Sequence, residues 1–207
     1  MLNNKTMIKK LLLINCYREK AEEKIKVYHT WLNSGSAAKC LELDVVTCRD
    51  ADPLPESKKF SAIIVSGSQK MVSSDEVESG LREFLKSNRR PLLGICYGHQ
   101  ALASVFGGLV KKDKQTHNGD EEIILIQKHK LFSGFPSYFK MAESHEEIVV
   151  NDRALASNFF VPAASASCLT ESIIHRKYQL CGVQFHPERS GELGIKLLVN
   201  FLKMIKD

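Results

Sequence analysis

Apolar and polar positions along the chain follow each other in a pattern that predicts strands and helices in turn. Residues 10–14 form a short apolar run, which is typical of a buried strand. Apolar residues then recur at helical spacing over residues 18–33, and Gly35 follows as a stop signal. Residues 41–45 alternate between apolar and polar, which predicts a second strand, and residues 61–65 predict a third.

The alternation of strand and helix continues through the middle of the chain. Apolar positions over residues 77–85 predict an amphipathic helix, with Ser73 and Glu76 as a capping box at its start. Residues 92–95 predict a fourth strand. Residues 100–106 predict a helix that ends at a pair of glycines.

The second half of the chain is richer in strands, which are predicted within residues 121–127, 146–150 and 178–185, and a last helix carries apolar residues over 197–205. This order predicts an α/β fold: a three-layer domain whose mostly parallel sheet has helices on both faces. All 207 residues are expected to form this single domain. In such sheets ligands bind at the carboxyl ends of the strands.

Composition and charge exclude several classes of protein. With 43% hydrophobic and 26% charged residues, the chain is predicted to be globular rather than disordered. The net charge of +5 comes from lysines interleaved with acids, so a solvated surface is expected and no nucleic-acid partner. No apolar run reaches 18 residues and no signal peptide is recognisable, which predicts a cytoplasmic protein without a membrane segment. None of the six cysteines forms a C-x-x-C pair, which argues against a zinc ribbon.

A candidate nucleophile lies where the fourth strand meets the following helix. Cys96 is flanked by glycines at positions 94 and 98, which is the cysteine form of the G-x-S-x-G elbow. The two glycines remove side chains that would clash in such a tight turn. The N-terminus of the helix would favour the thiolate of Cys96, and the backbone N–H of Tyr97 could stabilise an oxyanion. The pattern therefore predicts nucleophilic catalysis by Cys96.

A candidate base lies near the C-terminus. His186 follows an apolar strand, and Glu188 is two residues further on, where both side chains can project to one side of an extended backbone. A carboxylate beside an imidazole fixes its tautomer and stabilises the imidazolium. Cys96, His186 and Glu188 are therefore predicted to act as nucleophile, base and orienting residue.

The segments GICYGHQ and GVQFHPE, about 90 residues apart, resemble the class I, or triad, glutamine amidotransferases. The resemblance covers residues 11–202 and is strongest to the GMP-synthase branch. It implies that glutamine is attacked at its side-chain amide, giving a glutamyl thioester and ammonia, and that water then releases glutamate. It places the oxyanion hole at the backbone of Gly67 and Tyr97. The residues that it places around the substrate are Gln100, Ser144, His145 and Glu146.

Three segments depart from the family pattern. SGSQ replaces the Gly-Gly-Pro turn after the third strand, and SHEE replaces SHGD, so that Glu146 stands where the substrate approaches closely. HPERSGELG resembles the histidine-pathway branch of the family more than the purine branch. The resemblance therefore implies the thioester chemistry more firmly than the acceptor of the ammonia.

No P-loop motif and no synthetase domain are present, so no cofactor is expected in this chain. ATP and magnesium are expected on a separate ammonia-accepting synthetase. Two alternatives stay open. One is a stand-alone γ-glutamyl hydrolase or peptidase that uses the same three residues on a larger γ-glutamyl compound. The other is a regulatory subunit without catalytic activity.

Overall fold

A nine-stranded sheet organises the protein. The computed structural model describes residues 9–34, 41–48, 53–74 and 77–205, and in these ranges the strands lie in the order β2-β1-β3-β4-β9-β8-β7-β5-β6. The strands are β1 (Lys9–Asn15), β2 (Leu41–Thr47), β3 (Ala62–Val65), β4 (Leu92–Ile95), β5 (Val110–Leu125), β6 (Tyr138–Val149), β7 (Phe159–Ala164), β8 (Ser172–His175) and β9 (Leu180–Val183).

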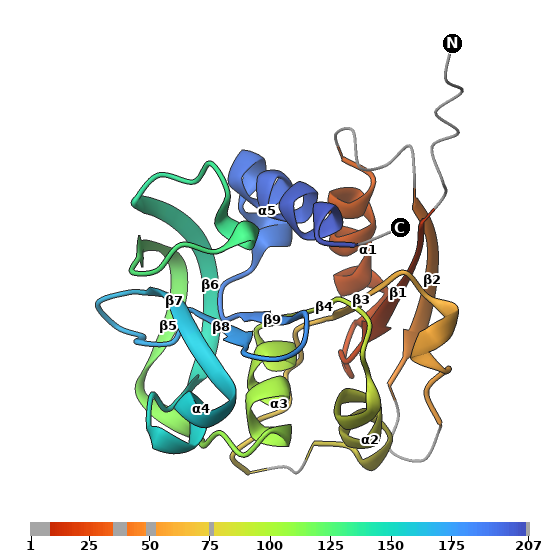
Figure 1. Cartoon of the computed structure of the whole chain (residues 1–207), viewed down its shortest axis with the longest axis horizontal. Coiled ribbons are helices and arrows are strands. Elements are labelled where there is room, and N and C mark those ends of the chain that lie inside the picture. Colours follow the sequence, from red (N-terminus) through yellow and green to blue (C-terminus); the bar gives the residue numbers. More distant parts are fainter. Residues whose placement is uncertain (1–8, 35–40, 49–52, 75–76, 206–207) are drawn as a thin grey trace.

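Helices cover both faces of this sheet (Figure 1). On one face lie α1 (Ala21–Leu32) and α5 (Gly191–Lys203), and on the other lie α2 (Ser79–Ser87) and α3 (Tyr97–Val105). A short helix, α4 (Arg153–Asn158), precedes β7. Each face has its own cluster of buried apolar residues. The three-layer α/β architecture predicted from the pattern of apolar residues is confirmed.

The sheet is mixed, and the two kinds of pairing separate along it. Strands β2, β1, β3, β4 and β9 pair in parallel. Strands β8, β7, β5 and β6 continue the sheet in antiparallel pairs. In the parallel part β3, β4 and β9 are buried at every position, which explains their continuous apolar sequences. Because β4 and β9 are parallel neighbours, the residues that follow them meet at one edge.

The starts of α2 and α3 differ from the predicted ones. The helix predicted over residues 77–85 begins at Ser79, with Glu78 before it, so the capping box predicted at Ser73 is wrong. Its partner Glu76 lies outside the described residues, as does the stop signal predicted at Gly35. The backbone N–H of Ser73 instead donates to the carboxylate of Glu147, 2.8 Å away. The next helix begins at Tyr97 rather than Gln100, which brings its first turn directly to Cys96.

Every helix in the described ranges is too short or too polar to pass through a lipid bilayer.

Candidate active site

Cys96 occupies a strained turn between β4 and α3. Its backbone has φ 50° and ψ −102°, in the region that non-glycine residues rarely adopt. The flanking glycines allow this turn, because a Cβ on Gly94 would lie 2.4 Å from the carbonyl oxygen of Gly98. A Cβ on Gly98 would lie 2.5 Å from the carbonyl oxygen of Val65, at the end of β3. The elbow predicted from the G-x-C-x-G spacing is therefore present.

Substitution Gly98→Ala is expected to destabilise the protein by about 2–3 kcal/mol, because the new methyl group meets backbone atoms of Val65 that cannot move independently. Thermal unfolding followed by circular dichroism measures the change. Ser104→Ala, in the same helix, is the control and should unfold within about 0.5 kcal/mol of the wild type. Equal stability of Gly98→Ala and the wild type would contradict this packing.

His186 and Glu188 form a close pair beside the nucleophile. Nδ1 of His186 lies 2.6 Å from Oε1 of Glu188, and both side chains are almost fully buried. The Nε2 atom of His186 has no hydrogen-bond partner among the described residues. Burial alone would lower the pKa of His186, but the charges of Glu188 and of Cys96 outweigh it and hold that pKa well above the usual range. This pair can accept a proton from the thiol and stabilise the resulting imidazolium.

Two further groups contact the sulfur of Cys96. The carbonyl oxygen of Ser144, on β6, lies 3.7 Å from Sγ. The side-chain amide of Gln184 donates to Sγ at 3.7 Å and also contacts Gln100. Sequence reasoning missed Gln184, although it lies two residues before His186, as strand periodicity requires for two side chains on the same side.

The two backbone donors predicted for the oxyanion hole differ in their surroundings. The N–H of Gly67 donates to the hydroxyl of Tyr28 at 3.0 Å, so it is already occupied in this structure. The N–H of Tyr97 opens α3, where no earlier turn can accept from it. The next residue of the loop, Ser68, lines the same pocket as Cys96, and its N–H makes no hydrogen bond with any described residue.

The residues predicted to bind substrate gather in one pocket of about 270 Å³. Its lining includes Cys96 and all four of these residues: Gln100, Ser144, His145 and Glu146. Loop residues 68–71 form the facing wall. The side-chain amide of Gln100 is buried and donates to the carbonyl oxygen of Glu147 at 3.0 Å. Nδ1 of His145 lies 2.9 Å from the same oxygen.

The two glutamates of SHEE have different positions. Glu146 is exposed, and its carboxylate pairs with Nζ of Lys112 at 3.4 Å. Glu147 is buried and accepts hydrogen bonds from the backbone N–H groups of Val72 and Ser73, at 2.6 and 2.8 Å. These hydrogen bonds hold the backbone next to loop residues 68–71, which line the pocket. Sequence reasoning missed this role of Glu147.

Glu78 is a second buried carboxylate, and it contacts the first residue of α3. The hydroxyl of Tyr97 donates to Glu78 at 2.8 Å, and Lys70 and Arg18 pair with the other oxygen of Glu78 at 3.1 and 3.0 Å. Burial would raise the pKa of Glu78, but a hydrogen bond from its own backbone N–H and the contacts with Tyr97, Lys70 and Arg18 outweigh burial and lower that pKa. The network joins the first turn of α3 to the pocket wall, because Lys70 belongs to both.

Glu143 is a buried carboxylate whose pKa should govern part of the pH dependence of stability. Burial raises its pKa to about 7, and Nε2 of His145 lies 3.3 Å from its carboxylate. Between pH 4.5 and 7 the unfolded chain releases this proton and the folded chain retains it, so rising pH favours unfolding.

Substitution Glu143→Gln is therefore expected to make the free energy of unfolding fall less between pH 4.5 and pH 8 than it does in the wild type, and the contact of Glu143 with the buried Glu171 makes the two carboxyls titrate as a pair. Denaturant unfolding of wild type and variant at both pH values measures it. Glu122→Gln, at an exposed position of β5, is the control and should leave the pH dependence unchanged. An equal pH dependence in wild type and Glu143→Gln would contradict the raised pKa.

Comparison with known proteins identifies the family of the chain. The sequence pattern of the family Glutamine amidotransferase class-I matches residues 24–205. The chain belongs to this family. As a class-I glutamine amidotransferase, it is a cysteine-dependent, glutamine-hydrolysing enzyme.

The most similar relatives of this amidotransferase include two archaeal proteins, each named as one subunit of a glutamine-hydrolyzing GMP synthase. It is 34% identical to the one from Saccharolobus solfataricus, over 79% of this chain and 87% of the relative. It is 36% identical to the one from Pyrococcus abyssi, over 73% and 80%. Both relatives have about the same length as this chain.

Solved structures support the fold of the amidotransferase. A structure described as a GMP synthase subunit from Thermoplasma acidophilum superposes with a TM-score of 0.77 at 21% identity, covering 96% of this chain and 94% of the other. A glutamine amidotransferase from Thermotoga maritima gives a TM-score of 0.64 at 20% identity, covering 95% and 83%.

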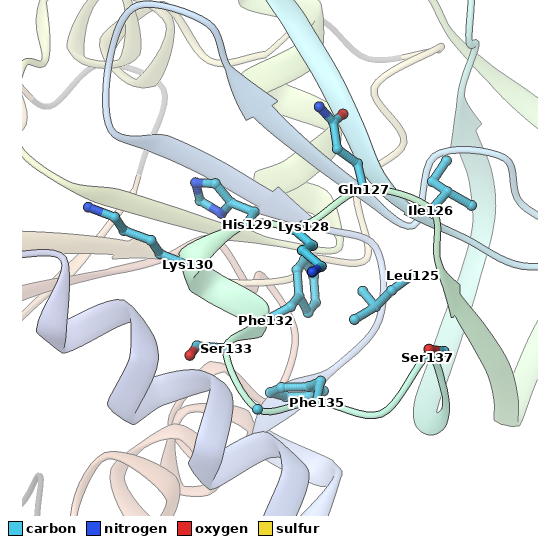
Figure 2. Close-up of a pocket in the computed structure, with 11 residues that line it drawn as sticks. Leu125, Ile126, Gln127, Lys128, His129, Lys130, Phe132, Ser133, Phe135 and Ser137 are labelled. Carbon is cyan, nitrogen blue, oxygen red and sulfur yellow. The ribbon is translucent and has the colours of Figure 1, made fainter.

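Another cavity of the amidotransferase lies away from this site. It measures about 790 Å³ and is lined by residues of the segment from Leu125 to Ser137, among them Phe132 and Phe135 (Figure 2). None of the predicted site residues lines it. Phe139 packs against both of these rings and against Phe185, the residue before His186. In the described part of the chain, no group of three or more His, Cys, Asp or Glu residues could hold a metal ion.

Proposed function

We propose that Cys96, His186 and Glu188 carry out glutamine hydrolysis and that the ammonia passes to a separate synthetase of the GMP-synthase type. The observation that supports this assignment is the 2.6 Å pair of His186 and Glu188 beside a cysteine held in a strained elbow. The archaeal relatives, which are named as GMP synthase subunits, support the choice of partner. ATP and magnesium belong to that partner in this proposal.

The proposed reaction has two steps. The sulfur of Cys96 attacks the side-chain amide carbon of glutamine while His186 takes the thiol proton and passes it to the departing nitrogen, which leaves as ammonia. Water, activated by His186, then attacks the thioester carbon and releases glutamate, and the thiol of Cys96 regains its proton. Glu188 fixes the imidazole tautomer in both steps.

Backbone donors stabilise the tetrahedral intermediates in this proposal. The N–H of Tyr97 contributes from the start of α3. Because Tyr28 occupies the N–H of Gly67, the second donor is assigned to the N–H of Ser68, which makes no hydrogen bond with the described residues. Gln100, Ser144, His145 and Glu146 line the space for the glutamine backbone.

The free chain is expected to hydrolyse glutamine slowly and to be accelerated at least about 10-fold by its synthetase. Ammonia formed in an open pocket is protonated and lost, and two loops that face the substrate, SGSQ and SHEE, depart from the family pattern. Steady-state glutaminase assays with and without a synthetase of the GMP-synthase type and its nucleotide substrates measure this effect.

A stand-alone γ-glutamyl hydrolase would give the opposite result in the same assays. It would run at full rate alone, gain nothing from a synthetase, and prefer γ-glutamyl peptides to glutamine. A mutant of the partner that cannot dock provides the control for non-specific stimulation.

A further inference from the structure

Two tyrosines from the N-terminal part of the chain meet the loop beside Cys96. Tyr28 lies on α1 and is 1% exposed, and Tyr17 follows β1. Their rings pack edge to face, with centroids 6.4 Å apart. The hydroxyl of Tyr28 accepts the N–H of Gly67 at 3.0 Å. A side chain from a helix on the sheet face thus holds the backbone of a loop at the active site.

Gly67 has little room on its other side. The Tyr28 oxygen accepts the N–H of Gly67, and the ring of Tyr17 packs against the ring of Tyr28. The space behind Gly67 is filled: a Cβ there would lie 2.6 Å from the Tyr17 hydroxyl and 3.2 Å from Cε1 of His186. The loop can therefore lie this close to His186 because residue 67 has no side chain.

Ser68 follows Gly67 in the loop, and its side chain and its backbone N–H have different surroundings. The hydroxyl of Ser68 donates to the carbonyl oxygen of Cys16 at 2.8 Å and accepts the N–H of Lys70 at 3.1 Å, so backbone groups hold its side chain in place. The N–H of Ser68 has no partner in the described ranges, and Ser68 lines the pocket of Cys96. The N–H of Gly67 is therefore bound by Tyr28, and the N–H of Ser68 is available to a ligand in the pocket.

We propose that Tyr28 is a positioning residue for the oxyanion hole. By binding the N–H of Gly67, its hydroxyl fixes the peptide units of the loop so that the N–H of Ser68 faces the tetrahedral intermediate on Cys96. The inference rests on the proposed function, since it needs an oxyanion to form at Cys96. It adds to that function a residue of α1 that touches neither substrate nor sulfur.

Substitution Tyr28→Phe tests the assignment, because it removes the hydroxyl and retains the ring. The expected result is a fall in kcat of at least about 10-fold with KM changed less than about 2-fold, since a misplaced oxyanion donor acts on the transition state. Affinity for the γ-aldehyde analogue of glutamine, whose carbonyl adds the Cys96 thiol to form a tetrahedral hemithioacetal, should weaken by a similar factor. Affinity for glutamate should be unchanged.

Two tyrosine variants serve as controls. Tyr17→Phe leaves the Tyr28 oxygen able to accept from Gly67, so its loss of kcat should be smaller than that of Tyr28→Phe. Tyr138→Phe, at a position 61% exposed, should behave as wild type. Titration of active sites with a glutamine-like electrophile counts the folded enzyme, so that kcat is expressed per competent site even if a variant is less stable.

The outcomes separate this inference from the proposed function. A wild-type rate in Tyr28→Phe, or a lower kcat with unchanged affinity for the aldehyde, would overturn the role of Tyr28 and leave the proposed function intact. A wild-type chain that hydrolyses no glutamine, alone or with a synthetase, would overturn both.

Discussion

Cys96→Ala is expected to lower glutamine hydrolysis by at least about 10⁴-fold while the protein remains folded, because no other described residue that lines the pocket can form the thioester. The methyl group of alanine fills less space than the thiol and requires no change in the elbow. Glutaminase assays measure the loss, and circular dichroism confirms the fold.

Covalent labelling gives an independent test of the same residue. A glutamine-mimicking electrophile should add one label, at Cys96, detected by mass spectrometry of peptides. The other described cysteines are buried away from the pocket: burial raises the pKa of Cys181 to about 12, and a hydrogen bond with Cys48 together with burial raises that of Cys16. Cys181→Ala is the matched control and should be labelled normally. A label at Cys16 or Cys181 would contradict the assignment.

Glu188→Gln is expected to lower kcat by about 10³–10⁴-fold with little change in KM. The amide keeps the shape of the carboxylate but removes the charge that holds the pKa of His186 above its usual range. The imidazolium of His186 would then be poorly stabilised, and the neutral imidazole could adopt the wrong tautomer against the amide.

The pH profile distinguishes orientation from substrate binding by Glu188. In the variant the pKa of His186 should fall, which NMR of the imidazole measures directly. Glu192→Gln, in the first turn of α5, is the control for removing one carboxylate nearby in the sequence. A variant of Glu188 with a raised KM and an unchanged kcat would show that this residue binds substrate instead.

Much of the site could be predicted because its residues follow strands. The apolar runs before Cys96 and His186 identified β4 and β9, and in a parallel sheet the ends of such strands share one edge. Strand alternation could also have separated Glu146 from Glu147, since successive side chains of β6 point to opposite faces.

Other contacts could not be read from the sequence. Tyr28 reaches Gly67 across 39 residues, and the contact depends on the direction of one peptide N–H, which no residue type encodes. The carboxylate of Glu147 binds backbone atoms of Val72 and Ser73, where side-chain identity has no influence. Glu143 was missed because a charged residue in a strand is ordinarily expected at the surface, and only the packing of the sheet buries it.

The division of the sheet has an evolutionary consequence. The nucleophile and the base follow two parallel strands, whereas Thr116 and residues 144–147 of the pocket wall come from β5 and β6 at the antiparallel end. Insertions or substitutions in this terminal hairpin can reshape the pocket without moving the strands that hold the reacting pair. Such an arrangement lets selection change which amide is accepted while the chemistry of hydrolysis is inherited unchanged.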